Sequence, residues 1–202
     1  RVAHLEACLP EIATLDCGTM NFAEADYVMT NTPGMLRDMA SRMADLGIRI
    51  EIEAFDTGHL WFAQQLVSEG LIPAPVMVQL CMGIPWGAPD DLNTFMAMVN
   101  NLPSEWIHSA FSIGRHQMAY VAAAVLSGGN VRVGLEDNLW LEKGHLATNA
   151  ELVARAVTIV EAMGVQVMTP DEVRAKLREY YEPFDRELAA ILGESPYWVS
   201  QD

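Results

Sequence analysis

Short apolar runs alternate with longer amphipathic stretches along the whole chain. Apolar runs bounded by turn residues predict β-strands at Ile12–Cys17, Ile48–Phe55, Val76–Met82, Trp106–Phe111 and Val131–Leu135. Apolar positions with helical spacing predict helices at Gly34–Asp45, Thr57–Glu69, Asp90–Asn100, Arg115–Leu126 and Asn149–Met163. Because each strand is followed by a helix, the pattern predicts an α/β fold built from parallel βα units.

The ends of the predicted helices carry the expected signals. Asn149 can cap the helix that it begins, and Gly164 follows that helix as a stop. A further helix is expected after Thr169, which serves as its N-cap, with Pro170 in the first turn. The polar, aromatic segment Tyr180–Asp202 is interpreted as a packing or oligomer-contact tail. Since no linker divides the chain, the sequence predicts a single domain over residues 1–202.

One face of every predicted strand is polar. If the more apolar face points at the helices, the opposite face presents Asp16, Glu51, Glu53, Gln79, His108, Arg132 and Glu136. A doubly wound sheet, which is covered on both faces, has nearly continuous apolar strands instead. The polar faces therefore favour a (β/α)8 barrel with its active site in the lumen. Such a barrel needs eight units, so the chain is predicted to form a partial TIM barrel. A small five-stranded flavodoxin-like domain fits the strand count but explains the charged faces poorly.

The segment 128–138, Gly-Gly-Asn-Val-Arg-Val-Gly-Leu-Glu-Asp-Asn, carries the clearest candidate chemistry. As a continuous strand it places Arg132, Gly134 and Glu136 on one face, with Asp137 at the strand end. Buried charges are costly unless they are paired, bind a metal or serve chemistry. The spacing alone leaves both a structural Arg–Glu pair and a functional site open.

Composition limits the classes of partner. The 202 residues are 51% hydrophobic and 19% charged, with 27 acidic and 12 basic residues and a net charge of −15. This balance argues against nucleic acid or an anionic membrane as a general partner, although a local arginine can still bind an anionic small molecule. Three cysteines without CxxC spacing, no long apolar span and no signal-peptide pattern indicate a cytoplasmic protein. Because the chain begins with Arg1, we interpret it as a processed or partial chain.

The segment 128–138 resembles the β-keto acid cleavage enzymes, the family of 3-keto-5-aminohexanoate cleavage. The similarity continues through Lys143-Gly144, Thr148–Val153 and Ala162–Lys176. Upstream, Asp16–Phe22 resembles the family's fourth-strand motif and Glu51–His59 its fifth. The resemblance implies a (β/α)8 barrel, here strands four to eight and a C-terminal tail.

By this resemblance the chain belongs to a metal-dependent acyltransferase, usually with zinc, that exchanges an acyl group between a β-keto acid and acetyl-CoA and releases acetoacetate. Glu136 would be a metal ligand, Arg132 a substrate-binding and catalytic residue, and Asp137 part of the acid–base network. Glu53, Glu51 and Asp16 would line the substrate pocket. Zinc would polarise the substrate ketone, and the forked guanidinium of Arg132 would hold its carboxylate. The family also implies a homo-oligomer, a tetramer.

The chain departs from the family in one large respect. The two other zinc ligands of the family are a His-x-His pair on the second strand, and this sequence contains no His-x-His. We therefore expect the C-terminal five-eighths of such an enzyme, active only when the missing strands are supplied. Two alternatives stay open: a non-catalytic partial barrel that acts as a binding or assembly module, and another metal-dependent barrel lyase or aldolase.

Several other polar residues are candidates for supporting roles. His59 and His116 follow predicted strands at the end where barrel active sites lie, and a hydrogen bond at a helix terminus is the expected role of each. The segment Ser112-Ile113-Gly114-Arg115 is a candidate for binding a CoA phosphate at a helix N-terminus. His108 is expected to be a core histidine with a satisfied hydrogen bond.

Overall fold

A computed structural model describes residues 2–23, 26–176 and 179 of the chain. It divides the chain into two compact units, Arg1–Met163 and Gly164–Asp202, and the two are described separately. The predicted tail Tyr180–Asp202 lies outside the described residues. The single-domain interpretation stays a prediction.

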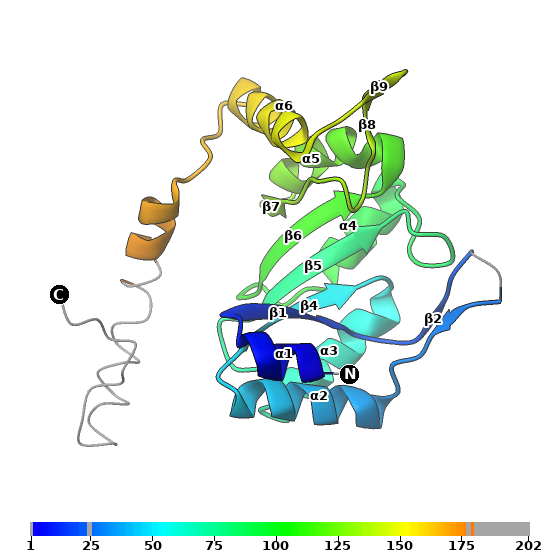
Figure 1. Cartoon of the computed structure of the whole chain (residues 1–202), viewed down its shortest axis with the longest axis vertical. Helices are drawn as coiled ribbons and strands as arrows, with labels where there is room; N and C mark the ends of the chain where they lie inside the picture. Colours follow the sequence, from blue (N-terminus) through cyan, green and yellow to red (C-terminus); the bar gives the residue numbers. More distant parts are fainter. Residues whose placement is uncertain (1, 24–25, 177–178, 180–202) are drawn as a thin grey trace. The chain divides into compact units, whose positions relative to one another are not determined.

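A parallel five-stranded sheet forms the centre of the first unit (Figure 1). Its strands are β1 (Ile12–Asp16), β4 (Arg49–Ala54), β5 (Met77–Met82), β6 (Ile107–Ser112) and β7 (Asn130–Val131). They lie side by side in the order in which they occur along the chain, β1-β4-β5-β6-β7. Five helices connect or follow these strands: α2 (Pro33–Asp45), α3 (Thr57–Ser68), α4 (Leu92–Asn100), α5 (Gln117–Leu126) and α6 (Asn149–Ala162). Helix α1 (Ala3–Cys8) precedes β1.

Two short antiparallel hairpins complete the unit. The pair β2 (Met20–Asn21) and β3 (Val28–Met29) follows β1, and the pair β8 (Trp140–Glu142) and β9 (His145–Leu146) follows β7. Both hairpins lie in connections that leave the carboxyl end of a sheet strand. In α/β proteins such connections build the functional site.

The apolar core lies between the helices and one face of the sheet. Strand β4 alternates between half-buried and buried side chains along its whole length, so its two faces differ in kind. A single apolar cluster joins the sheet to five helices, with Leu15, Ile50, Ile52, Val78, Leu80 and Ala110 from the strands and Leu5, Leu36, Leu60, Phe95 and Tyr120 from α1 to α5. Helices on one face and strands in sequential order are typical of a barrel wall and not of a doubly wound sheet. The prediction of a partial barrel is confirmed, and the flavodoxin-like alternative is wrong.

Polar caps fix where the helices begin. Thr32, Asp56 and Asp91 each accept a hydrogen bond from a backbone N–H in the first turn of α2, α3 and α4. Helix α6 begins with a capping box, in which Thr148 and Glu151 accept reciprocal backbone hydrogen bonds. In the second unit, Thr169 and Glu172 make the same reciprocal pair at the start of a helix over residues 170–176. The predicted Thr169 cap is confirmed, while α6 is capped by Thr148, one residue before the predicted Asn149.

The last strand is shorter than predicted. Strand β7 pairs with β6 through two residue pairs only and ends at Val131, so Arg132 already lies beyond it. The chain then turns, because the Gly134 carbonyl accepts hydrogen bonds from the backbone N–H groups of Asp137 and Asn138. The prediction of a continuous strand with Arg132 and Glu136 on one face is therefore wrong.

His108 lies on the opposite face of the sheet from the one predicted. The register pairs His108 with the buried Val78, which faces the helices, and pairs Ser109 with Gln79 on the polar face. The imidazole Nε2 of His108 is 3.1 Å from the hydroxyl of Ser127, where α5 has ended. Gly129 makes room for the ring, because a Cβ atom there would lie 2.5 Å from Nε2. His108 is thus a hydrogen-bonded core histidine, as expected, but its neighbour Ser109 occupies the polar face.

Candidate active site

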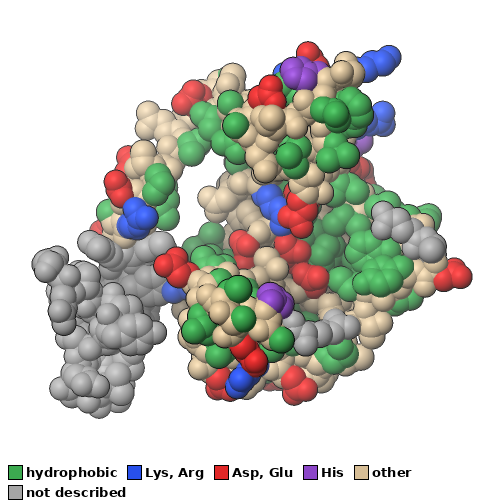
Figure 2. Space-filling model, viewed as in Figure 1, with side chains coloured by type: hydrophobic (Ala, Val, Ile, Leu, Met, Phe, Trp, Pro, Cys, Tyr) green, Lys and Arg blue, Asp and Glu red, His purple; other side chains and the backbone are tan. Residues whose placement is uncertain are grey.

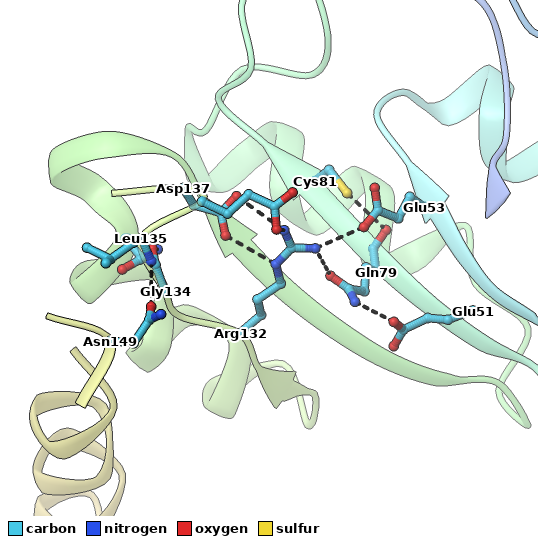
Figure 3. A network of polar contacts seen from close by, with 11 residues as sticks. Glu51, Glu53, Gln79, Cys81, Arg132, Gly134, Leu135, Asp137 and Asn149 are labelled. Carbon is cyan, nitrogen blue, oxygen red and sulfur yellow. Dashed lines mark hydrogen bonds and ion pairs between the residues drawn. The ribbon is translucent and has the colours of Figure 1, made fainter. Parts of the chain in front are cut away.

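Arg132 is the centre of a polar network at the carboxyl end of the sheet (Figure 3). Its Nη1 donates to Glu53 at 2.9 Å and to Gln79 at 2.8 Å. Its Nε donates to Asp137 at 3.1 Å, and its Nη2 donates to Glu136 at 2.7 Å. All three nitrogen atoms of the guanidinium are therefore engaged, and two of the acceptors come from strands far away in the sequence.

The sheet register aligns the acceptors. Asp16, Glu53 and Gln79 are direct cross-strand partners on β1, β4 and β5, so their side chains project from the same face. The Gln79 amide in turn donates to Glu51 at 2.5 Å. These residues form one continuous polar row across three strands. Figure 2 shows acidic side chains gathered around a basic one near the middle of the visible face.

An aromatic ring supports the guanidinium from below. The Arg132 guanidinium carbon lies 4.3 Å from the centre of the Phe111 ring, a cation–π distance. Phe111 is buried in a small apolar cluster with Met20, Phe55 and Cys81. Because the ring and the hydrogen bonds act together, the guanidinium is held in one orientation.

Burial changes the proton affinities of the carboxylates in this network. Burial and the neighbouring charge of Asp16 raise the pKa of Glu53 from 4.5 to about 7, against the opposing effect of Arg132. Burial also raises the pKa of Asp137, although Arg132 acts in the other direction. A carboxyl group with a pKa of about 7, as in Glu53, is suited to proton transfer near neutral pH.

Glu136 differs from the other acceptors in exposure. It lies on the turn after β7, and its side chain is 82% exposed, whereas that of Asp137 is 7% exposed. The structure therefore brings Arg132, Asp137, Glu53 and Glu136 into direct contact. It adds Glu51 through Gln79 and Asp16 through its pairing with Glu53. All six residues predicted for the site lie together, and Gln79, which links two of them, was predicted only as a polar-face residue.

A metal site is not complete within the described chain. Among residues 2–23, 26–176 and 179, no group of three or more His, Cys, Asp or Glu side chains is placed to hold a metal ion. Glu136 contributes one exposed carboxylate, which Arg132 already binds. A single carboxylate does not satisfy the four-coordinate preference of zinc, so these residues do not fit a metal by themselves.

His59 has a structural role at the start of α3. It is 9% exposed, its Nδ1 accepts from the Phe55 backbone N–H at 3.3 Å, and its Nε2 lies 3.4 Å from the Thr19 carbonyl. This places the ring proton on Nε2, where it is donated to Thr19. Burial lowers the pKa of His59, which favours the neutral ring. The expected helix-terminus hydrogen bond of His59 is confirmed.

Gly18 gives the His59 ring its space, and we expect Gly18→Ala to destabilise the protein. A Cβ atom at Gly18 would lie 2.1 Å from the ring, and the backbone φ of +140° disfavours any side chain. Overpacking and backbone strain together predict a loss of about 2 kcal/mol in the free energy of unfolding. The matched control is Gly34→Ala, in the first turn of α2 with nothing within 4 Å, where no loss is expected. Urea unfolding measures both variants, and equal stabilities would contradict this role of Gly18.

A second polar group lies beside the network and involves a residue that the sequence did not indicate. The Asp90 carboxylate accepts a hydrogen bond from the buried Ser112 hydroxyl at 2.7 Å and also contacts Nδ1 of His116. Hydrogen bonds from these two groups lower the pKa of Asp90 against the effect of its burial. Asp90 lies 22 and 26 residues before its partners, so no local spacing could reveal it. His116 contacts a carboxylate and not the helix end predicted for it.

No helix in the described part of the chain is long and apolar enough to cross a membrane.

Comparison with known proteins identifies the family. A sequence model described as beta-keto acid cleavage enzyme matches residues 1–178. The chain is 73% identical, over 178 residues, to the 3-dehydrocarnitine:acetyl-CoA trimethylamine transferase of Rhizobium meliloti (strain 1021), covering 88% of this chain and 59% of that protein. It is 37% identical, over 166 residues, to the 3-keto-5-aminohexanoate cleavage enzyme of Fusobacterium nucleatum, covering 82% of this chain and 60% of that protein. The chain thus spans about three fifths of the length of these curated relatives.

Solved structures support the same fold. The chain superposes on ObcA in its binary complex with oxaloacetate with a TM-score of 0.69 at 19% identity, covering 86% of this chain and 45% of that one. The family model and the two relatives carry the assignment that the sequence motifs implied. The chain belongs to the β-keto acid cleavage enzyme family.

Proposed function

We propose that the protein exchanges acyl groups between a β-keto acid and acetyl-CoA. The β-keto acid loses the bond between its methylene carbon and its ketone carbon, and acetyl-CoA loses its thioester bond. The acetyl group joins the released CH2–carboxylate unit to give acetoacetate, and the remaining acyl group joins the CoA sulfur. Two bonds break and two form, so no oxidant or reductant is needed. The observation that carries the proposal is the preoriented Arg132 network in a chain of this family.

The substrate class that fits best is a β-keto acid with a cationic group. The relative that is 73% identical is named for 3-dehydrocarnitine, a β-keto acid with a trimethylammonium group. In this chain, the carboxylates of Glu53, Glu136 and Asp137 outnumber the single guanidinium that they contact. A site with excess negative charge favours a cation at one end of the substrate, while Arg132 binds the carboxylate at the other end.

Each residue of the polar network has a separate role in the proposed reaction. Arg132 binds the substrate carboxylate through its forked donors, after the substrate displaces the exposed carboxylate of Glu136 from Nη2. Asp137 accepts from Nε of Arg132 and fixes the fork, and its carboxyl group, whose pKa burial raises, is our candidate for moving a proton. Glu53, with its raised pKa, and Glu51 with Asp16 line the substrate pocket on the polar sheet face. The buried ring of Phe111 packs against one face of the guanidinium and helps to hold it in position.

The test is an assay of the complete protein with 3-dehydrocarnitine and acetyl-CoA. We expect acetoacetate and a new CoA thioester in equal amounts by mass spectrometry, and neither product when acetyl-CoA is left out. A panel of neutral and anionic β-keto acids is the specificity control, and the cationic substrate should give the highest kcat/KM. The absence of acetoacetate from every β-keto acid would refute the proposed function.

The proposed reaction also uses a divalent metal, which is zinc by resemblance. This chain supplies only part of the ligand set of that metal. When bound, it would polarise the substrate ketone as a Lewis acid. We propose Glu136 as its ligand from this chain, and the histidine ligands would come from sequence that the chain does not contain. A homo-oligomer, tetrameric by resemblance, and a cytoplasmic location complete the proposal.

For the complete protein we expect Glu136→Gln to lower the bound metal content. Loss of an anionic ligand weakens zinc binding because the ligand charge and geometry are both altered. Metal per protein chain is measured by inductively coupled plasma mass spectrometry after dialysis. Glu142→Gln, at an exposed position on β8, is the control and should leave the metal content unchanged. Full metal occupancy in the Glu136 variant would remove Glu136 from the ligand set.

A further inference from the structure

The connection between β6 and α5 carries a guanidinium that has no acidic partner among the described residues. Arg115 is exposed, and its Nε donates to Nε2 of His116 at 3.3 Å. Within the part of the chain that the structure describes, no carboxylate forms an ion pair with Arg115. Its two terminal nitrogen atoms therefore keep their donors available, in a chain of net charge −15.

A chain of hydrogen bonds holds this arginine from one side. The buried Ser112 hydroxyl donates to Asp90, Asp90 contacts Nδ1 of His116, and Nε2 of His116 accepts from Arg115. The imidazole of His116 therefore links a carboxylate to a guanidinium through its two ring nitrogens. Gly83 lies against this group without a side chain, since a Cβ atom there would approach the Ser112 hydroxyl within 2.8 Å.

The same connection is tied to the Arg132 network from the other side. Gly114, whose φ of +64° places it in the left-handed region, donates its backbone N–H to the Asp137 carbonyl at 2.6 Å. The buried Gln117 side chain donates to the Gly134 carbonyl at 3.0 Å. The turn Gly114–His116 is thus fixed directly beside the segment that supplies Asp137 and Glu136.

The position in the barrel suggests the ligand. In (β/α)8 barrels a phosphate is frequently bound by the connections after the seventh and eighth strands, together with a short extra helix. If the chain holds strands four to eight, β6 is the seventh strand, and the short 3-10 turn Gly114–His116 follows it. Acetyl-CoA is the phosphate-bearing substrate of the proposed reaction, and a guanidinium with free terminal donors can bind a phosphate through two hydrogen bonds.

We infer that Arg115 binds a phosphate group of acetyl-CoA and that Asp90, acting through His116, is its positioning residue. The inference rests on the proposed function for the identity of the ligand. It assigns the nucleotide end of acetyl-CoA to the β6–α5 connection and leaves the β-keto acid to Arg132. Arg115 thus binds acetyl-CoA, and Arg132 binds the β-keto acid.

The test compares acetyl donors with and without phosphates in the complete protein. For Arg115→Ala we expect the KM for acetyl-CoA to rise about tenfold, with kcat and the KM for the β-keto acid unchanged, as for loss of one charge-assisted contact. With acetylpantetheine, which has no phosphate, wild type and variant should be equal. Acetyl-dephospho-CoA, which lacks only the ribose phosphate, then shows which phosphate Arg115 contacts. Arg42→Ala is the charge control and should match wild type. It removes an exposed arginine of α2 that pairs with Glu6 of α1.

Asp90→Asn should raise the KM for acetyl-CoA in the same direction by a smaller factor, again without effect on acetylpantetheine. Equal changes with both donors, or no change in Arg115→Ala, would overturn the inference. If wild type exchanges no acyl group, the proposed function fails. In that case, calorimetric titration with 3′-phosphoadenosine 5′-phosphate still decides on Arg115. Binding that Arg115→Ala weakens would support the site, and binding that it leaves unchanged would refute it.

Discussion

Arg132→Ala is expected to remove almost all turnover in the complete protein while the fold is retained. Truncating one member of a hydrogen-bonded, largely buried charge network costs roughly 2–5 kcal/mol, so we expect a loss of about a thousandfold in kcat/KM. The substrate carboxylate loses its forked donor, and Glu53 and Asp137 lose the cation that lowers their pKa values. Steady-state kinetics measure the loss, and circular dichroism checks the fold.

A conservative variant separates charge from geometry at this position. Arg132→Lys keeps the positive charge but replaces the planar fork by a single ammonium, which cannot reach Glu53, Asp137 and Glu136 together. We expect it to recover little of the lost kcat and to bind the β-keto acid weakly. The exposed Arg42→Ala, far from the network, should behave as wild type. An Arg132→Ala protein with normal kcat would show that Arg132 is a structural ion-pair partner, the alternative that the spacing left open.

Alternation of apolar and polar positions predicted most of the fold because it reflects which face of each strand meets the helices. Asp16, Glu53 and Gln79 were placed on one face from the sequence, and the register confirms this. The contact between Glu53 and Arg132 spans 79 residues, and it follows from those faces once the strands lie in sequential order. The family motif located Arg132, Glu136 and Asp137 because they are neighbours in the chain.

The two wrong strand predictions, at Trp106–Phe111 and after Val131, have local causes. In the run Trp106–Phe111 both alternating sets contain an aromatic and a small or polar residue, so the pattern does not decide which set faces the helices. The predicted face assignment of this strand is therefore wrong by one position, and it put His108 on the polar face where the structure has Ser109. After Val131, apolar residues continue to alternate, but three hydrogen bonds to the Gly134 carbonyl bend the chain into a turn. One of these hydrogen bonds comes from Gln117 of a preceding helix, and such a distant contact leaves no trace in the local pattern.

The pH dependence of stability gives the second large effect, through Glu53. Its pKa is raised in the folded state from 4.5 to about 7, so between these values the folded protein holds a proton that the unfolded chain has released. The contribution of Glu53 to the free energy of unfolding is therefore fully present below pH 4.5. It is lost as the pH rises to about 7. At about 1.4 kcal/mol for each pKa unit, we expect a loss of roughly 3 kcal/mol.

Glu53→Gln should remove this dependence, because an amide imitates the protonated carboxyl group at every pH. The variant is expected to gain roughly 3 kcal/mol relative to wild type between pH 4.5 and 8, measured as the difference between urea unfolding curves. Glu69→Gln, which removes an exposed partner of Arg37, is the control and should not gain in this way, because the pKa of Glu69 is lowered instead. The sign of the stability difference shows whether burial or the pairing with Arg132 dominates the pKa of Glu53. Arg132 divides its donors among four acceptors, so its attraction does not offset the burial of Glu53 and the charge of Asp16. If instead wild type became more stable than Glu53→Gln with rising pH, pairing with Arg132 would outweigh burial, and Glu53 would be ionised throughout.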